Sequence, residues 1–181
     1  GCQSVLESIT IVVLPPLQVT ADGGIGCIGE AITISATGSG GNGQGIVTWN
    51  NGFIGSPQTF PNLPPVDTFF VATISDGCSP DVIDTAWITF NPIPVADFSA
   101  LGGGCAPVSP TFTSESSISQ GAIVSWYWDF GDAASGTNNT SDLENPVHIY
   151  DTEGTYTVSL TVVSDSGCTN TYTEIGVVTV D

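Results

Sequence analysis

Two aspartates stand close together in the segment "WYWDFGD", which ends at Asp132. Carboxylates beside aromatic rings suggest three kinds of chemistry: a hydrolytic pair, a calcium site, or a platform for sugars. Glycosidases place two carboxylates on opposite sides of a substrate, whereas Asp129 and Asp132 flank a single turn without an evident nucleophile or base. We therefore expect no catalysis, and the chain is predicted not to be an enzyme.

Calcium requires several clustered oxygen ligands. Asp129 and Asp132 are the candidate ligands, and Asp22 or Asp97 would add to them near domain junctions. No EF-hand spacing is present, so turn capping is the simpler role, and we expect no metal or other cofactor. The single histidine, His148, lacks the partners of a catalytic triad; it is expected to make a structural hydrogen bond.

The overall charge narrows the classes of partner. The chain has 181 residues, with 18 acidic side chains and no lysine or arginine. A net charge of −18 repels phosphate backbones and anionic lipid, so neither nucleic-acid binding nor direct membrane insertion is expected. Short runs of Val, Ile, Thr and aromatic residues, separated by Gly and Pro, predict an all-β fold.

Internal repeats organise these strands. "PLQVTADGGIGC" and "PVADFSALGGGC" share the same spacing, and each is followed by a tryptophan segment and a late strand ending in "DGC" or "SGC". We infer two homologous units, over residues 15–92 and 93–181. Residues 1–14 are expected to be the last strand of a preceding unit.

The repeats also suggest how the five cysteines pair. Each complete unit has one early and one late cysteine, which predicts the disulfides Cys27–Cys78 and Cys105–Cys168. Cys2 occupies the late position, so its partner is expected upstream, outside the given sequence. Disulfides persist outside a reducing cytosol, which predicts an extracellular or cell-surface location.

Strict alternation defines the faces of the late strands. In "GTYTVSLTVVS" the core side chains are expected to be Tyr156, Val158, Leu160 and Val162. In "VSWYWDFGD" they are expected to be Val124, Trp126, Trp128 and Phe130. Several such strands in a unit of this size predict tandem immunoglobulin-like β-sandwiches.

Residues 93–181 resemble the PKD (polycystin-type, immunoglobulin-like) domain. The resemblance rests on "WDFGD" (128–132), on "PVHIY" (146–150) and on the strand "GTYTVSLTV" (154–162). The cysteines and the "GC" tail resemble variants in large Bacteroidota surface proteins exported by type IX secretion. Residues 15–92 resemble the degenerate immunoglobulin-like modules beside them, with "TWNNG" in place of "WDFGD".

Three residues match short glycosylation patterns. Asn138 and Asn139 stand in "NNTS", which contains N-linked acceptor sequences. Thr85 stands in "DTA", which resembles the Bacteroidota O-glycosylation pattern. Among the tryptophans, Trp49 and Trp128 share one repeat position and are expected in the core, whereas Trp87 is the candidate for an exposed sugar platform.

The resemblance implies a spacer or binding module. The leading hypothesis is a structural repeat segment of a long extracellular fibre or adhesin, a disulfide-locked rod resistant to proteases. Its partners would be neighbouring repeats or copies of itself, and also a surface polysaccharide. The alternative is a pair of carbohydrate-binding accessory modules in a secreted hydrolase, favoured by an exposed Trp87 beside other aromatic rings.

Overall fold

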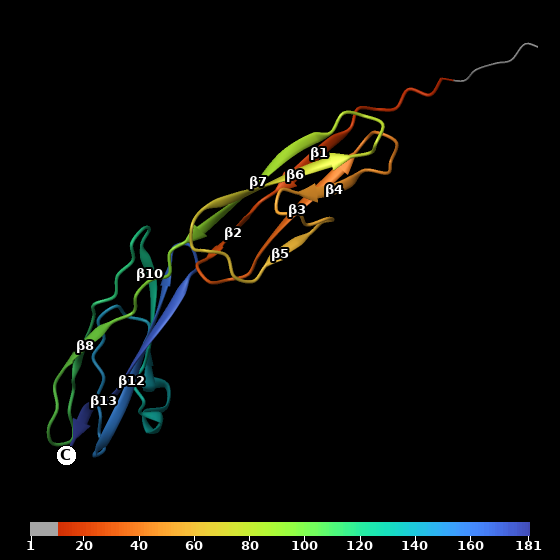
Figure 1. Ribbon diagram of the computed structural model, residues 1–181. Helices are drawn as coiled ribbons and strands as arrows, with labels where there is room; N and C mark the ends of the chain where they lie inside the picture. Colours follow the sequence, from red (N-terminus) through yellow and green to blue (C-terminus); the bar gives the residue numbers. More distant parts are fainter. Residues whose placement is uncertain (1–10) are drawn as a thin grey trace, which may run out of the picture. The chain divides into compact units, whose positions relative to one another are not determined.

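The computed structural model describes residues 11–181 (Figure 1). Unit 1 ends at Phe90 and unit 2 spans Asn91–Asp181, so the division falls two residues before the expected one. Apart from a single 3₁₀ helix, η1 (Ala133–Asn139), all regular elements of the described residues are strands. The predicted all-β class is confirmed. In the same part of the chain, no helix has the length and apolar character needed to cross a membrane.

The strand expected over residues 1–14 falls mostly outside the described residues. Residues 11–14 are described, and they belong to no strand. The side chains of Ile11, Val12 and Val13 are largely exposed. The strand was expected to pair within a preceding unit, outside the given sequence, so it stays a prediction.

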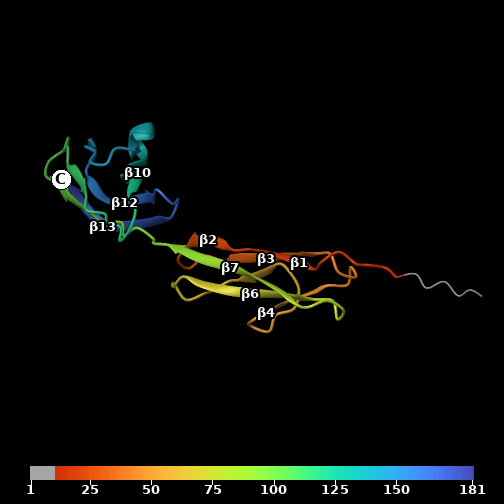
Figure 2. The same cartoon turned by 90° about the horizontal axis from the view of Figure 1, so that it is seen from above.

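Unit 1 is a sandwich of two sheets. One sheet has the order β1 (Gln18–Asp22), β3 (Ile32–Ser39), β5 (Gln58–Phe60). The other has the order β2 (Gly24–Cys27), β7 (Val82–Asn91), β6 (Thr68–Ser75), β4 (Ile46–Trp49). Figure 2 shows β1 and β3 on one side of this unit and β6 and β4 on the other. Alternate side chains fill the core between them: Ile32, Ile34, Ala36, Trp49, Ala72, Ala86 and Ile88.

The chain passes from one sheet of unit 1 to the other at Gly23. β1 pairs with β3, and β2, which follows after this single residue, lies beside β7. A Cβ atom on Gly23 would lie 1.8 Å from the carbonyl oxygen of Trp87, so only glycine fits. The same crossover is tied by Asp84, whose Oδ2 accepts a hydrogen bond from the Ala21 amide at 2.8 Å.

Unit 2 is a second sandwich, built around longer strands. Its larger sheet has the order β11 (Thr140–Ser141), β10 (Ile123–Asp129), β12 (Gly154–Ser164), β13 (Thr169–Val180). The smaller sheet pairs β8 (Phe98–Leu101) with β9 (Thr111–Ser114). Single bridges from Val108 to Tyr150 and from Thr111 to Val147 attach the "PVHIY" segment to the β9 side.

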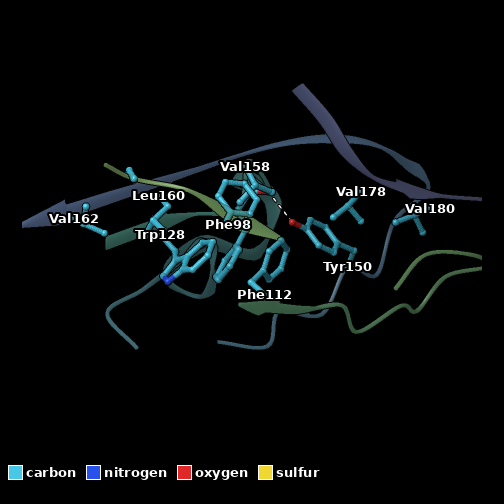
Figure 3. Close-up of a cluster of buried hydrophobic side chains, with 11 residues drawn as sticks. Phe98, Phe112, Trp128, Tyr150, Val158, Leu160, Val162, Val178 and Val180 are labelled. Carbon is cyan, nitrogen blue, oxygen red and sulfur yellow. Dashed lines mark hydrogen bonds between the residues drawn. The ribbon is translucent and has the colours of Figure 1, made fainter. Parts of the chain in front are cut away.

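The core of unit 2 is aromatic at its centre and aliphatic around it (Figure 3). Phe98 and Phe112 contact Trp128 edge-on or tilted, with ring centroids 5.2 and 5.6 Å apart. Val158, Leu160 and Val162 of β12 are fully buried and Tyr156 packs against them, so the alternation predicted for this strand is confirmed. Aromatic pairs of this kind add about 0.5–1.5 kcal/mol each beyond their buried area.

The alternation predicted for β10 is correct at one end and wrong at the other. Trp128 and Phe130 are buried as expected and Trp126 is partly buried, but Val124 is 57% exposed. The register of β10 against β12 shifts between Ile123 and Ser125. This bulge inverts the order of faces, so Ile123 packs on the core in place of Val124.

The predicted disulfide Cys27–Cys78 is not formed. Cys78 is free and exposed, whereas Cys27 is disulfide-bonded elsewhere. The contacts of Ala21 with Asp84 and of Gly23 with Trp87 show that the chain runs along β7 toward its end. Cys27 therefore lies near the end of β7, and Cys78 lies before its start. Ten residues of strand span about 33 Å, far beyond the reach of a disulfide.

The predicted disulfide Cys105–Cys168 fails for the same reason. Cys105 is free and exposed, and its neighbour Ala106 donates to the carbonyl of Asp181, just past β13. Cys168 immediately precedes β13 and is disulfide-bonded. The two cysteines thus stand at opposite ends of a twelve-residue strand. Cys2 lies outside the described residues, and its predicted upstream partner stays a prediction.

Replacing Gly23 tests the crossover. Gly23→Ala is expected to lower the free energy of unfolding of unit 1 by about 1–3 kcal/mol, because its Cβ would overlap the backbone of Trp87. Gly26→Ala is the matched control, since its Cβ meets side-chain atoms and no backbone, of Ile32 at 3.2 Å and of Glu30 at 3.7 Å. Urea unfolding followed by tryptophan fluorescence measures both. Equal effects of the two substitutions would contradict the crossover.

Candidate functional site

The loop after β10 brings together the two aspartates and Asn139. Asp129 Oδ1 accepts hydrogen bonds from the Gly131 amide and from Asn139 Nδ2, both at 2.9 Å. Asn139 Oδ1 in turn accepts from the Asp132 amide at 2.6 Å. The Asn139 side chain therefore bridges the two ends of the turn, and Asp129 serves as its acceptor. These residues shape the loop as turn residues do.

Asp132 points the other way, into the protein, where it meets His148. Asp132 Oδ2 lies 3.1 Å from His148 Nε2, and the two side chains are 9% and 4% exposed. Among the described residues, this is the only contact at salt-bridge distance between a carboxylate and a histidine. The structural hydrogen bond predicted for His148 is confirmed, and its partner is an aspartate of the "WDFGD" segment.

Aromatic rings hold His148 from two sides. The Phe130 ring stacks on it with centroids 4.4 Å apart and planes at 9°. The Tyr150 ring meets it edge-on, with centroids 4.5 Å apart. The imidazole is thus fixed in orientation by packing as well as by Asp132.

Tyr150 closes this cluster with a hydrogen bond. Its hydroxyl donates to the carbonyl oxygen of Phe130 at 2.9 Å, the dashed line in Figure 3. Burial, and secondarily the nearby Asp132 carboxylate, raises the pKa of Tyr150 well above its usual range. The phenol therefore remains a hydrogen-bond donor and does not act as a base at any ordinary pH.

Gly131 allows the strand to turn into this loop. Its φ is +68°, and a Cβ atom there would lie 2.2 Å from the carbonyl oxygen of Thr157. Both the backbone angle and the close approach require glycine. The sequence "WDFGD" is accordingly a buried tryptophan, a bridged turn and an inward-pointing aspartate.

The arrangement does not form the calcium site considered from the sequence. The carboxylates of Asp129 and Asp132 are directed to different partners, an amide and an imidazole. Asp97 Oδ1 accepts from the Phe98 amide at 2.9 Å. Across residues 11–181, no three His, Cys, Asp or Glu side chains are grouped so that they could hold a metal ion.

An open hollow of about 480 Å³ lies beside the loop. It is lined by residues of η1, of β11 and of "PVHIY", including Asn138, Val147 and Ile149. Asn138 is exposed on η1, whereas the Asn139 side chain is engaged in the turn. Thr85 lies mid-strand on β7 with its amide bonded to Asp84 Oδ1 at 2.8 Å. Glycosylation at the three positions stays a prediction.

The tryptophans fall into two groups. Trp49 and Trp128 are both buried, and each donates its indole N–H to a backbone carbonyl, of Gly55 at 2.8 Å and Leu143 at 2.9 Å. The shared core role is confirmed. Trp87 is 62% exposed and lies beside Phe69, which is 47% exposed. Phe69 was not singled out from the sequence; its position opposite Trp87 depends on the register of β6 and β7.

Backbone amides take the place of cations around the exposed carboxylates of unit 1. Asp76 accepts from the amides of Ser79, Cys78 and Asn42 at 2.7, 2.9 and 3.0 Å. These bonds, that of Ser79 foremost, lower its pKa from 3.8 to about 2. The amides of Ala21 and Thr85 likewise lower the pKa of Asp84.

The two sandwiches define an immunoglobulin-like class of fold. In agreement with this, domains A168–A170 of titin match 91% of the chain with a TM-score of 0.51 and 14% identity, a likeness of fold only. For unit 2 the comparison is more specific, because the PKD domain family matches residues 91–180.

Individual relatives align with about half of the chain or less. A microbial collagenase of Vibrio alginolyticus is 42% identical over 89 residues, which are 49% of this chain and 10% of the collagenase. Collagenase ColQ1 of Bacillus cereus is 38% identical over 78 residues, 42% of this chain and 8% of that protein. The PKD1 domain of Vibrio anguillarum Epp is 38% identical and is covered to 99%, with half of this chain aligned and a TM-score of 0.42. Through unit 2, the chain belongs to the PKD domain family.

Removing the imidazole tests the buried pair. His148→Ala is expected to lower the free energy of unfolding of unit 2 by about 3 kcal/mol, because Asp132 is left buried without its partner. Replacing both residues by alanine is expected to cost less than the sum of the single changes. Urea titrations of the four proteins give the coupling, with exposed Glu144→Ala as control. Additive losses would mean that the pair contributes nothing as a unit.

The lowered pKa of Asp76 predicts a dependence of unit 1 on pH. A carboxyl whose folded pKa lies near 2 stabilises the fold above its unfolded value of 3.8, and this is lost as pH falls through about 2. Asp76→Asn should therefore lower Tm at neutral pH and have a smaller effect near pH 2. Calorimetry between these limits measures this difference. Exposed Asp81→Asn should follow the parent protein, and a constant deficit in D76N at all pH values would refute the assignment.

Proposed function

We propose that the chain is a non-catalytic structural segment of a larger extracellular protein, in which the two sandwiches act as spacer modules. One observation carries this proposal. Every chemically distinctive side chain of the PKD signature is bonded internally: Asp129, Asp132, Asn139, His148 and Tyr150. A site with its acids, imidazole and phenol so engaged stabilises a loop and leaves no group to attack or protonate a substrate.

The chemistry of the chain supports an extracellular location. Cys27 and Cys168 are disulfide-bonded, and disulfides persist in oxidising compartments. Trypsin-like proteases cleave after lysine or arginine, and the chain contains neither. A rod in a fibre or adhesin uses both properties. The Bacteroidota surface-protein context stays a prediction, since the relatives described above are from Vibrio and Bacillus.

A second setting is an accessory segment of a hydrolase. The observation that favours it is that the matching relatives are named as collagenases and metalloproteases. The chain spans about a tenth or less of the length of these collagenases. Within such a protein the two sandwiches would position other domains, and the internally bonded PKD signature would have the same structural role as in a rod.

The free cysteines indicate how such a segment would be joined to its neighbours. Cys78 and Cys105 are exposed; Cys78 lies before the start of β7 and Cys105 lies near the C-terminal end of β13, while their repeat equivalents Cys168 and Cys27 are disulfide-bonded. We infer that Cys78 and Cys105 bond to cysteines of further repeats. Each bond joins two thiols, releases two protons and passes two electrons to a disulfide oxidant of the compartment, which is reduced to two thiols.

Thiol mapping tests this linkage. In the isolated 181-residue chain, Cys78 and Cys105 should react with a maleimide under native conditions, and Cys78→Ser and Cys105→Ser should each remove one labelled site. In the full-length parent protein, non-reducing peptide mapping should find both residues in disulfides with other repeats. Free thiols at both positions in the parent would refute the linkage, whereas proteolytic or glycosidic activity of the isolated chain would refute the structural function.

A further inference from the structure

The outer face of the larger sheet of unit 1 has no structural partner among the described residues. Three cross-strand rows form it, because Phe69 lies opposite Trp87, Val71 opposite Thr85, and Thr73 opposite Ile83. We name these six residues the Trp87 face. Their neighbours in sequence, such as Ala72, Ala86 and Ile88, point to the opposite side and complete the core.

The aromatic row is exposed without being needed for the fold. The rings of Phe69 and Trp87 lie with centroids 5.1 Å apart and planes at 48°. They are 47% and 62% exposed, and the indole N–H of Trp87 has no hydrogen-bond partner among residues 11–181. Trp49, in contrast, is buried with its N–H bonded to Gly55. Large aromatic side chains exposed as a pair indicate a binding surface.

The face is also free of charge, in a chain where charge is abundant. None of its six residues is acidic, although the chain has 18 carboxylates and no cation on lysine or arginine. Asp84 is the single carboxylate of β7, and it turns away from the face to accept from the Ala21 amide. Ser75 continues the face along β6, and Thr48 extends it onto β4 through its pairing with Thr73; both residues carry hydroxyl groups.

The charge of the chain and of the Trp87 face limits which kinds of ligand can bind there. A second copy of this chain brings a net charge of −18 and is repelled, as are nucleic acids and acidic polysaccharides. A basic protein would be attracted to carboxylates, and the Trp87 face has none. An uncharged polymer meets neither attraction nor repulsion, and its affinity must come from apolar stacking and hydrogen bonds to hydroxyl groups.

We propose that the Trp87 face binds an uncharged polysaccharide. The C–H faces of its sugar rings stack on Trp87 and Phe69, and its hydroxyl groups bond to Thr85, to Thr73 and to the free indole N–H. The flat row of side chains on a sheet suits an extended chain. A few polar groups among apolar ones are typical of sites that fix orientation. This inference goes beyond the structural function proposed above and does not depend on it.

Binding of the 181-residue chain to defined polysaccharides tests the proposal. The probes are insoluble cellulose and chitin in pull-down assays, and soluble β-glucan, xylan and mannan in affinity electrophoresis, with alginate as the anionic control. At least one neutral probe should retard the protein or bring it down, and alginate should not. Binding to none of the neutral probes, or binding to alginate alone, would overturn the proposal.

Substitutions at Trp87 and Phe69 test whether the polysaccharide binds at the Trp87 face. Trp87→Ala should weaken binding to the active probe at least tenfold and Phe69→Ala severalfold, while Trp87→Tyr should retain most of it. Tyr127→Ala is the matched control, because Tyr127 is a 54% exposed strand aromatic of unit 2. Unchanged Tm shows that each variant folds. Equal binding by W87A and the parent protein would overturn the proposal, and so would sedimentation showing that the parent dimerises through this face.

Discussion

The absence of lysine and arginine is the constraint on which the rest of the structure depends. Eighteen carboxylates must be accommodated with one histidine and the chain terminus as the only possible cations. The protein meets this with backbone amides. Asp67 accepts from Phe90, Asp97 from Phe98, and Asp165 from Ala122, at 2.9–3.2 Å. Each bond ties a loop or strand end to the chain nearby or to another segment, so the acidic residues serve as turn-forming groups.

The same constraint explains the buried pairing of Asp132 with His148. Placing a carboxylate inside a protein is costly unless a charge or several donors compensate for lost hydration. Asp132 is buried, and the single histidine of the chain is its partner. Phe130 and Tyr150 then fix the imidazole by stacking. The residues of the PKD signature thus compensate for the burial of the Asp132 carboxylate, and their polar and aromatic groups are engaged in these contacts.

The sequence predicted those features that depend on neighbouring residues or on repetition. Alternation gave the core side chains of β12, and the repeat gave the shared burial of Trp49 and Trp128. Val124 was wrongly predicted to be a core residue, because a bulge inverts the faces of β10. No residue in this segment indicates the bulge from the sequence alone. The cysteine pairs were misplaced because a repeat specifies equivalent positions but not the end of a strand at which each one lies.

The Phe69–Trp87 pair is another feature that could not be predicted from the sequence. The two residues are far apart in sequence, and only the register of β6 against β7 places them side by side. Sequence reasoning found Trp87 as the least constrained tryptophan, yet a lone exposed ring is ordinary on a protein surface. The register makes it one of a pair, on a face from which carboxylates are absent.

On the proposals above, the two units use similar sandwiches for different functions. In unit 2 the distinctive residues form internal hydrogen bonds in the loop around Asp132 and His148, which agrees with the proposed spacer function. Unit 1 lacks the "WDFGD" signature and has "TWNNG" in its place. From β7 its core takes the side chains of Ala86 and Ile88, with Phe90 packed against them. Since the core requires nothing of the outer positions, these can carry aromatic rings at little cost to folding, and a binding role is best sought in the unit whose sequence departs from the family.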